Sequence, residues 1–416
     1  MSGVTLPRVA PTAYLETLFQ SNDIIDGPTI EFAQAHADDD VRQLALQASR
    51  WPDVDMPAAL QQIAGRQVAR TKLPLWASTP GLLYPPHLSM EQCSSEQTAR
   101  YKAQLVTGDS LVDLTGGLGV DFAMMARGMQ RATYVERQAH LCQLARHNLP
   151  LLGLPQARVV QADAVEHLQA MKPVDTIFID PARRDLAGNR VYGLQDCTPD
   201  VSALATCLLD KAQTVIVKLS PMLDVHQALR QLPSVAQVHI VAVHGECKEL
   251  LLVMQRSHSG DVAVHCVNND QSFSYTLGEP ATPAPVWDET LPPTGLWLHE
   301  PNAAIMKAGC HDLLAARLGL QVVARDSHLM VSDAPEPGFP GRSFAVAGYS
   351  TMNKRELKAL LAGTTHANVA VRNFPMRAPE LARRLKVKDG GETFLFGTTT
   401  ASGKHIIIKC TANEQI

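Results

Sequence analysis

Glycines and carboxylates are concentrated in residues 113–121, which read DLTGGLGVD. The apolar run SLV precedes this stretch, and a helix-like run, FAMMARGMQ, follows it. Glycines placed between a strand and a helix let a ligand approach the backbone closely. The stretch therefore predicts a binding turn, and its flanking residues decide which ligand fits.

Two phosphate-binding patterns are incomplete in this turn. A dinucleotide site needs G-x-G-x-x-G, but Gly117 and Gly119 are not followed by the third glycine. A nucleoside triphosphate loop needs Gly-Lys followed by Ser or Thr, and no such lysine follows. Asp113 before the turn and Asp121 after it would also repel a pyrophosphate. The two carboxylates favour instead a ligand with an ammonium and a sulfonium, and S-adenosylmethionine carries both.

Two more acids end the next two predicted strands. Glu136 ends ATYVE, twenty residues after Gly116, where a carboxylate can bind ribose hydroxyls. Asp163 ends ARVVQAD, where it can accept a hydrogen bond from an adenine amino group. Taken singly, each acid is explained as well by a strand-end cap or a solvated side chain. Their order and spacing after the glycine turn predict S-adenosylmethionine as the cofactor. The predicted cofactor-binding residues are Asp113, Thr115, Gly116, Gly117, Gly119, Asp121, Glu136, Asp163 and Asp180.

A fourth predicted strand, DTIFID, ends at Asp180 and is followed by Pro-Ala-Arg183-Arg184. Ligands of a doubly wound sheet bind at the carboxyl ends of its strands, so this loop should face the transferred methyl group. Asp180 is a predicted catalytic residue that accepts a hydrogen bond or a proton from a nitrogen. Arg183, also a catalytic candidate, and Arg184 are predicted to bind a substrate phosphate. Salt bridges to helix carboxylates are the alternative for the arginines. Lys218, at the end of the fifth strand, is predicted to bind substrate in the same crevice.

The loop after Asp180 resembles two known signatures incompletely. It resembles the D-P-P-[YF] loop of amino-group methyltransferases but lacks the aromatic residue that stacks on a flipped base. It also resembles the D-P-P-R loop of uracil-5 methyltransferases, which need a cysteine nucleophile where this chain has VKLSP. Cys247, in GECKEL, is another thiol near the predicted crevice, and we expect a buried structural cysteine there.

The elements that must position these residues alternate between short β-branched runs and helical stretches from 110 to 256. This alternation predicts an α/β fold, a Rossmann-like class I methyltransferase sheet that is parallel with one antiparallel strand. The last two runs, 237–244 and 249–254, are separated only by GECK, which is too short for a crossover. They must be antiparallel neighbours, with Lys248 and Glu249 expected at the turn. A helical domain is predicted before the sheet and small α+β domains after it.

Six segments carry a family resemblance: PPHLSMEQCSSEQTARYKA, DLTGGLGVD, IDPARR, KLSPMLD, GECKEL and EPNAAIMKAG. Together they resemble bacterial class I S-adenosylmethionine-dependent methyltransferases with a C-terminal THUMP-like domain, over most of the chain beyond residue 80. The resemblance implies a helical region at 1–100, a methyltransferase domain at 101–257, a linker and small ferredoxin-like segment at 258–340, and a THUMP-like α+β domain at 341–416. THUMP domains are RNA-binding units of tRNA-modifying enzymes, so the resemblance implies an RNA substrate.

Charge is distributed unevenly along the 416 residues. Residues 341–416 hold twelve Lys or Arg against five Asp or Glu, a net of +7, so residues 1–340 carry −11 of the total of −4. A basic C-terminal module can bind a polyanion, although a merely solvated basic face is the alternative. The predicted substrate-binding residues there are Arg372, Arg377 and Arg384, with Phe374 placed among them to stack on a base.

Several classes of protein are not expected. The eight cysteines include no C-x-x-C pair, so neither a zinc site nor a disulfide framework is predicted, and no metal is expected. No signal segment and no membrane span is visible, so we expect a cytoplasmic protein. The prediction is a methyltransferase acting on RNA, at a base nitrogen of tRNA or rRNA. The alternatives are a protein or small-molecule substrate, or a non-catalytic, RNA-associated factor that binds S-adenosylmethionine.

Overall fold

A computed structural model describes residues 25–183, 193–290 and 295–412. The chain divides into two compact units. The first unit comprises residues 1–219, 226–235 and 252–259, and the second comprises residues 220–225, 236–251 and 260–416. Residues 1–24 of the helical region predicted at 1–100 lie outside the described residues.

Short helices build the N-terminal part of the first unit. Three of them begin at aspartates, Asp26, Asp40 and Asp55, whose carboxylates accept backbone N–H groups that the first helical turn leaves unpaired. Ser95 caps a further helix in the same way, through a 3.2 Å hydrogen bond from Thr98 N–H. These helices are α2 Gly27–Ala35, α3 Val41–Leu46, η1 Ala48–Arg50, α4 Met56–Lys72, α5 Pro74–Ser78, α6 His87–Gln92 and α7 Glu96–Ala103.

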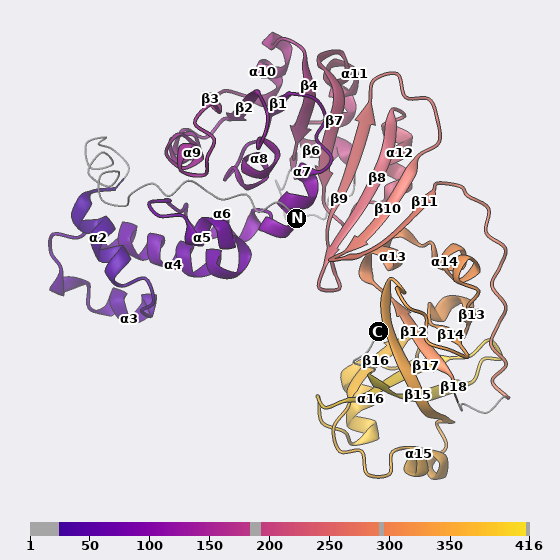
Figure 1. Ribbon diagram of the computed structural model, residues 1–416. Coiled ribbons are helices and arrows are strands. Elements are labelled where there is room, and N and C mark those ends of the chain that lie inside the picture. Colours follow the sequence, from indigo (N-terminus) through magenta and orange to yellow (C-terminus); the bar gives the residue numbers. More distant parts are fainter. Residues whose placement is uncertain (1–24, 184–192, 291–294, 413–416) are drawn as a thin grey trace. The chain divides into compact units, whose positions relative to one another are not determined.

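The main sheet has nine strands in the order β11-β10-β8-β9-β7-β4-β1-β2-β3 (Figure 1). Strands β3, β2, β1, β4 and β7 pair in parallel, as the alternation of strands and helices predicts. The strands are β1 Ser110–Asp113, β2 Arg131–Glu136, β3 Arg158–Gln161, β4 Val174–Ile179, β7 Ala212–Leu219, β8 Val235–Val243, β9 Glu246–Gln255, β10 Ala263–Asn268 and β11 Gln271–Thr276.

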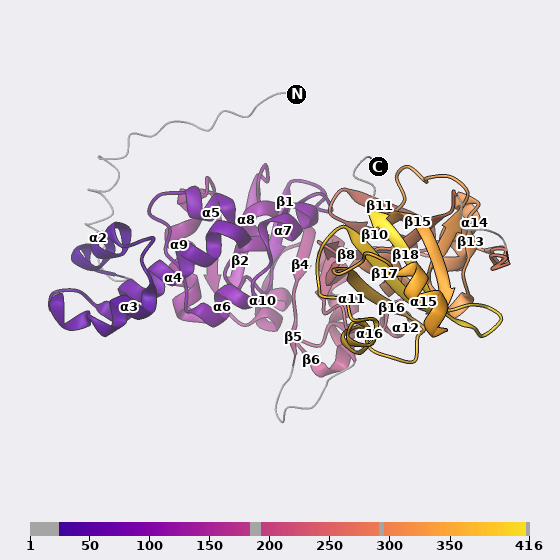
Figure 2. The ribbon, with the colours of Figure 1, turned by 90° about the horizontal axis from the view of Figure 1, so that it is seen from below.

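Helices cover both faces of the parallel strands in the first unit. Helices α8 and α9 bury Phe122 and Cys142 in one core with Tyr134 of β2. Helices α10 and α11 contact each other on the opposite face (Figure 2). The connecting elements are α8 Val120–Met125, α9 Ala139–Leu151, α10 Ala164–Ala170, the β5 Ala182–Arg183 and β6 Cys197–Thr198 pair, η2 Leu194–Asp196, α11 Val201–Lys211 and α12 Val225–Gln231. The predicted Rossmann-like fold class is confirmed.

The turn between β8 and β9 differs from the prediction. It consists of His244 and Gly245, with φ of 51° and 77°, whereas Lys248 and Glu249 lie inside β9. Two consecutive residues with positive φ match the twist of antiparallel strands and make a two-residue hairpin possible. The placement of Lys248 and Glu249 in the turn was therefore wrong, because β9 already begins at Glu246, before its apolar run.

The sheet also continues beyond the predicted methyltransferase segment. Strand β10 pairs with β8 in parallel, and β11 pairs with β10 antiparallel. These two strands were not predicted from the sequence, although residues 263–268 alternate between half-buried and buried positions. They are joined by Asn269-Asp270, and Asn269 has a φ of 53°, which asparagine tolerates better than most residues.

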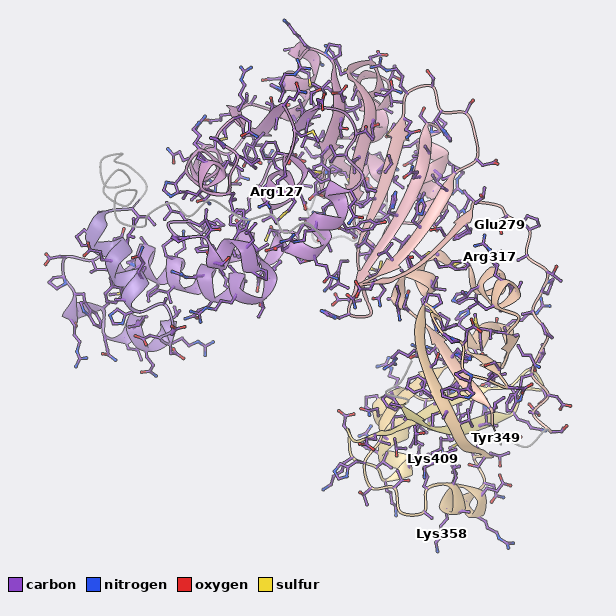
Figure 3. All side chains as sticks on the ribbon, viewed as in Figure 1. Arg127, Glu279, Arg317, Tyr349, Lys358 and Lys409 are labelled. Atoms are coloured by element: carbon purple, nitrogen blue, oxygen red, sulfur yellow. The ribbon has the colours of Figure 1, made fainter. Side chains whose placement is uncertain are left out.

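A second sheet, in the second unit, has the order β13-β14-β12-β15-β18-β17-β16. The sequence GETFLFGTTTASGKHIIIKC, residues 391–410, predicts a hairpin by its two apolar runs, and it forms antiparallel β17 and β18. Arg317 of α14 pairs with Glu279, which follows β11, at 2.7 Å (Figure 3). The elements of this part are β12 Trp297–Pro301, α13 Ala303–Ala308, α14 His311–Leu318, β13 Gln321–Val322, η3 Arg325–Ser327, β14 Met330–Ser332, β15 Gly341–Thr351, α15 Lys354–Leu360, β16 Asn368–Arg372, α16 Ala378–Leu385, β17 Thr393–Thr399 and β18 His405–Ala412. No helix of the described residues has the length and apolar character that crossing a membrane would require.

Candidate active site

The glycine turn leaves β1 and enters α8 with two left-handed residues. Gly117 has a φ of 54° and Gly119 a φ of 88°, a conformation that side chains with a Cβ rarely adopt. A Cβ built on Gly117 would have only the Thr115 carbonyl oxygen within 4 Å, at 3.8 Å. The backbone at Gly117 is therefore open on that side, as a ligand lying along the turn requires.

Gly116 has a different role from its neighbours. A Cβ at this position would lie 2.2 Å from the Tyr134 ring, so the glycine is required by packing. Tyr134 is fully buried in β2, and its hydroxyl donates to the carbonyl of Gly117. Gly116 N–H donates in turn to the carbonyl of Val135 at 2.8 Å. The sequence pattern did not predict a role for Tyr134, whose ring and hydroxyl group fix the shape of the turn.

Glu136 and Asp113 bring two buried carboxylates to this turn. Glu136 ends β2 and accepts two backbone hydrogen bonds, from Gly117 N–H at 3.0 Å and Gln138 N–H at 2.9 Å. Asp113 ends β1 and accepts from Thr115 N–H at 2.9 Å. Both predicted cofactor-binding residues therefore accept hydrogen bonds from the backbone of the glycine turn.

The pKa of Asp113 is raised well above its ordinary value. Burial is the main cause, and the carboxylates of Asp121, Asp180 and Glu136 raise this pKa further, whereas the hydrogen bond from Thr115 N–H lowers it. A carboxyl group in such surroundings is favoured as an anion only when a positive charge comes close. This donor set suits a cationic ligand and not a phosphate, so the residues present fit S-adenosylmethionine.

Asp121, in the first turn of α8, is held by side chains from three other segments. Lys102 Nζ lies 3.1 Å from its Oδ1, Lys218 Nζ lies 3.6 Å from its Oδ2, and Ser94 Oγ donates to Oδ2 at 2.7 Å. Lys102 is completely buried in α7. Lys102 and Ser94 were not predicted as parts of the site, although both lie within PPHLSMEQCSSEQTARYKA. They are recognised as parts of the site only because both lie close to Asp121 in the folded chain. Their spacing along the sequence does not predict that proximity.

Asp180 follows β4, and its side chain is more exposed than that of Asp121, at 39% against 12%. Its backbone N–H donates to Thr115 Oγ1 at 2.7 Å, and its Oδ2 accepts from Lys218 Nζ at 2.6 Å. Lys218, on β7, therefore bridges Asp121 and Asp180. The structure thus brings together the predicted residues Thr115, Asp121, Asp180 and Lys218.

Other predicted residues have local partners or lie outside the described part. Asp163 is exposed and caps α10 by accepting from Val165 N–H at 2.8 Å. Arg183 belongs to β5, but its side chain, like the whole of Arg184, lies outside the described residues. Cys247 is half-buried, and burial raises the pKa of its thiol to about 11, so it is protonated at neutral pH. Among the residues that the structure describes, no cluster of His, Cys, Asp and Glu could hold a metal ion.

The predicted basic residues of the second unit fall into two groups. Arg372 pairs with buried Glu300 at 2.6 Å, and Arg342 pairs with the other oxygen of the same carboxylate. Arg377 and Arg384, by contrast, are exposed on α16 and its N-terminal cap. Arg372 therefore stabilises the second sheet, whereas the residues of α16 are accessible to a partner.

Comparison with known proteins gives a consistent assignment. Residues 341–412 match the family described as THUMP domain-like, residues 297–340 match a ferredoxin-like domain family, and residues 97–222 match the family described as Conserved hypothetical protein 95. A crystal structure from Porphyromonas gingivalis W83, assigned as a methyltransferase, is 35% identical, with a TM-score of 0.80. The alignment covers 93% of this chain and 98% of that one.

Two proteins of Mycobacterium tuberculosis, from strains CDC 1551 and H37Rv, are also similar. Each is named an uncharacterized S-adenosylmethionine-dependent methyltransferase and is 26% identical over 304 residues, which is 72% of this chain and 80% of theirs. The similarity extends over nearly the full length in the Porphyromonas protein, and the fold and the acidic glycine turn agree with it. The chain therefore belongs to the S-adenosylmethionine-dependent methyltransferases that carry a C-terminal THUMP-like domain.

Proposed function

We propose that this methyltransferase modifies RNA, at a base nitrogen of tRNA or rRNA. The observation that carries the proposal is the exposed basic surface of the THUMP-like domain, on α16 and the residues on either side of it. Its members are Arg377, Arg383, Arg384, Lys386 and Lys388. Exposed Lys and Arg side chains attract the phosphate backbone and release its counterions.

The amphipathic character of α16 supports this interpretation. Leu381 and Leu385 are buried in the core of the domain, so the helix has one side committed to packing. Its basic residues are left to face solvent, which is the arrangement that a polyanion could use. Phe374 is half-buried and packs with this same core, against the expectation that it is free to stack on a base.

In the proposed cofactor site, each residue has a role that its position allows. The backbone at Gly117 and Gly119 lies along the bound molecule, and Glu136 accepts from ribose hydroxyls with lone pairs that its two backbone hydrogen bonds leave available. Asp163 accepts from the adenine amino group, and Asp113 faces the positive charge. When bound, S-adenosylmethionine supplies the methyl group together with its own leaving group.

Asp180 is the proposed catalytic residue. It is fixed from two sides, through its backbone by Thr115 and through its side chain by Lys218, which leaves Oδ1 to accept from the acceptor nitrogen. The Asp180 carboxylate orients this nitrogen and removes its proton as the methyl group is transferred. Arg183 and Arg184 follow directly in sequence and are proposed to bind the adjacent phosphate.

The experiment that tests this function compares modified nucleosides by mass spectrometry in total RNA from cells with and without the gene. One methylated nucleoside should disappear and should return when wild-type protein transfers labelled methyl groups to the deficient RNA. Asp180→Asn should retain cofactor binding and lose most of the transfer. Asp210→Asn, which changes an exposed aspartate of α11, serves as the control and should transfer normally.

Each other outcome points to a different function. If no nucleoside changes while the purified protein methylates a protein or small-molecule extract, the RNA assignment is wrong. If Asp180→Asn restores the modification in cells as well as the wild type does, the protein is a cofactor-binding RNA factor rather than the catalyst.

A further inference from the structure

Four charged side chains of alternating sign form a continuous row in the first unit. Lys102 contacts Asp121, Asp121 contacts Lys218, and Lys218 contacts Asp180, at 3.1, 3.6 and 2.6 Å. Their exposure rises along the row, from 0% at Lys102 through 12% and 15% to 39% at Asp180. The row therefore begins in the protein interior and ends at the proposed catalytic carboxylate.

A completely buried lysine is rare unless an anion compensates it, because removing an ammonium from water costs several kcal/mol. Lys102 comes from α7, a helix that precedes the first strand of the sheet. Its side chain lies at the end of the row farthest from Asp180, so it cannot touch a substrate bound there. Its Nζ contacts Asp121 and the Ser94 hydroxyl, and Asp121 in turn contacts Lys218, so its charge can reach the proposed catalytic group through Asp121 and Lys218.

Asp121 is the residue through which this effect must pass. A second contact, from Ser94 Oγ at 2.7 Å, fixes Oδ2, the same oxygen that faces Lys218. Lys218 contacts two carboxylates, those of Asp121 and Asp180, and its position between them depends on both being anions. If Asp121 lost its charge, Lys218 would lose the more buried of its two carboxylate contacts, and its side chain would move out toward solvent and away from its present position beside Asp180.

We infer that Lys102 is a positioning residue of the methyltransferase, which keeps Asp121 in place so that Lys218 presents Asp180 to the acceptor. This inference rests on the proposed function only in naming Asp180 as the catalytic group. The contact between Lys218 and Asp180 exists without any substrate and can be measured by itself.

The pKa of Asp121 also indicates that Lys102 stabilises the charged form of this carboxylate. Burial raises its pKa, but Lys102 and then Lys218 lower it, together with the hydroxyl of Ser94, and the resulting pKa lies below the ordinary value. The charged and titratable groups that face Asp121 from its surroundings are Lys102, Lys218, Asp113, Asp180 and Cys93. Without Lys102, burial would dominate and Asp121 would take up a proton at a higher pH.

The test uses the full-length protein and four variants. Lys102→Met removes the cation, Lys102→Arg keeps it, and Lys102→Met/Asp121→Leu replaces the buried pair by apolar side chains. Lys211→Met is the matched control, because Lys211 also has a bound Nζ, 2.6 Å from the Met171 carbonyl oxygen, and lies outside the row. Replacing both members of a buried ion pair usually restores the stability that a single replacement loses.

Lys102→Met should melt at a lower temperature than the wild type, with a difference that widens as the pH rises from 5 to 8. The sign follows from Asp121. In the wild type, ionised Asp121 contributes stability above its ordinary pKa of about 3.9, and this contribution is lost as the pH falls through the lowered folded value. In Lys102→Met the folded pKa is raised, so ionising Asp121 costs stability. Lys102→Arg and Lys211→Met should show no such widening.

The double variant separates positioning from folding. It should regain the melting temperature of the wild type, yet its kcat for methyl transfer to the deficient RNA should stay on the order of 100-fold lower. Its crystal structure should show Lys218 Nζ beyond hydrogen-bond distance from Asp180 Oδ2. If kcat recovers together with stability, or if the contact of 2.6 Å persists in that crystal structure, the inference is wrong.

Failure of the proposed function gives a different result. In that case the wild type itself transfers no methyl group to RNA. The melting temperatures and the crystal structure of the double variant still decide the role of Lys102, since neither measurement needs an acceptor.

Discussion

Gly116 and Gly117 are adjacent in the turn but are required for different physical reasons. Gly117 has a left-handed backbone and open space at its Cβ position, which is the requirement of a ligand-facing residue. Gly116 has no positive φ, and its missing side chain makes room for the Tyr134 ring. Substitutions at the two positions should therefore fail in different ways, one in binding and the other in packing.

Gly116→Ala should lower the stability of the first unit by about 1–3 kcal/mol, the usual cost of overpacking a core. The new methyl group would come within 2.2 Å of a ring that is fully buried and cannot move aside. Thermal unfolding measures the effect. Combining the change with Tyr134→Leu, which removes the ring, should recover part of the loss, and a double variant as unstable as the sum of both changes would contradict this explanation.

Glu136→Gln should weaken binding of S-adenosylhomocysteine about tenfold or more, measured by calorimetry. The amide keeps one acceptor oxygen but loses the charge, so it cannot accept from Gly117 N–H, Gln138 N–H and two ribose hydroxyls at once. Glu166→Gln, an exposed change on α10, is the control and should bind normally. Unchanged affinity in Glu136→Gln would remove this residue from the cofactor site.

At the scale of elements, the sequence predicts well whatever depends on local pattern. The parallel strands and the hairpin of β17 and β18 follow from the pattern of apolar runs and appear as expected. Strands β10 and β11 were missed because both are short and mix polar with apolar residues, and the exposed face of β11 carries Ser272, Ser274 and Thr276. The positions of Asp113, Glu136 and Asp180 at strand ends could be predicted, because the topology places such ends together.

Contacts between distant elements could not be predicted in this way. The row from Lys102 to Asp180 joins residues from α7, α8, β7 and the loop after β4. Each of these residues alone is compatible with a solvated surface position. Only the packing of α7 against α8 brings Lys102 to Asp121, and that packing depends on many weak apolar contacts which no motif records.

Helix α16 is the element on which RNA binding should depend. Replacing Arg383 and Arg384 by Gln removes two exposed cations and leaves the buried leucines in place. Affinity for the deficient RNA should fall, and the slope of log K against log salt should become shallower by about 1.4, since each phosphate that is no longer neutralised removes about 0.7 from the slope. Filter binding between about 50 and 200 mM salt measures both values.

The control for this prediction lies on another helix of the same domain. Lys354→Gln and Arg355→Gln in α15 also remove two exposed cations, and they should change the salt slope by much less. Equal effects of the two pairs would show that RNA responds to the net charge of the domain and not to a surface on α16. Cofactor binding should stay unchanged in both variants.

At the scale of the whole molecule, the two units should respond to acid to different extents. In the first unit, the raised pKa of Asp113 means that its contribution is fully present below the ordinary pKa and is lost as the pH rises. The second unit contains buried histidines that are held neutral. Burial, with a smaller effect of stacked His265, lowers the pKa of His239 to about 3, and burial lowers that of His299 to about 4.

His311, which is half-buried, is a third histidine of the second unit that is held neutral. Burial, with a smaller effect of stacked His328, lowers its pKa to about 4. Each of these three histidines binds a proton in the unfolded chain below about pH 6.5 but not in the folded unit. Stability therefore falls as the pH drops from about 6.5 toward 4, by up to about 1.4 kcal/mol per pH unit for each histidine.

Calorimetry between pH 7 and 5 should therefore show the transition of the second unit moving to lower temperature more steeply than that of the first. His299→Gln tests the cause, because His299 is enclosed between the hydroxyls of Ser343 and Ser332, and an amide can satisfy both. In this variant the slope of the free energy of unfolding against pH should be smaller by the contribution of one proton, roughly 1.4 kcal/mol per pH unit. His140→Gln changes an exposed residue of α9 and should leave the slope of the free energy of unfolding against pH unchanged. A slope unaltered by His299→Gln would mean that the acid sensitivity has another origin.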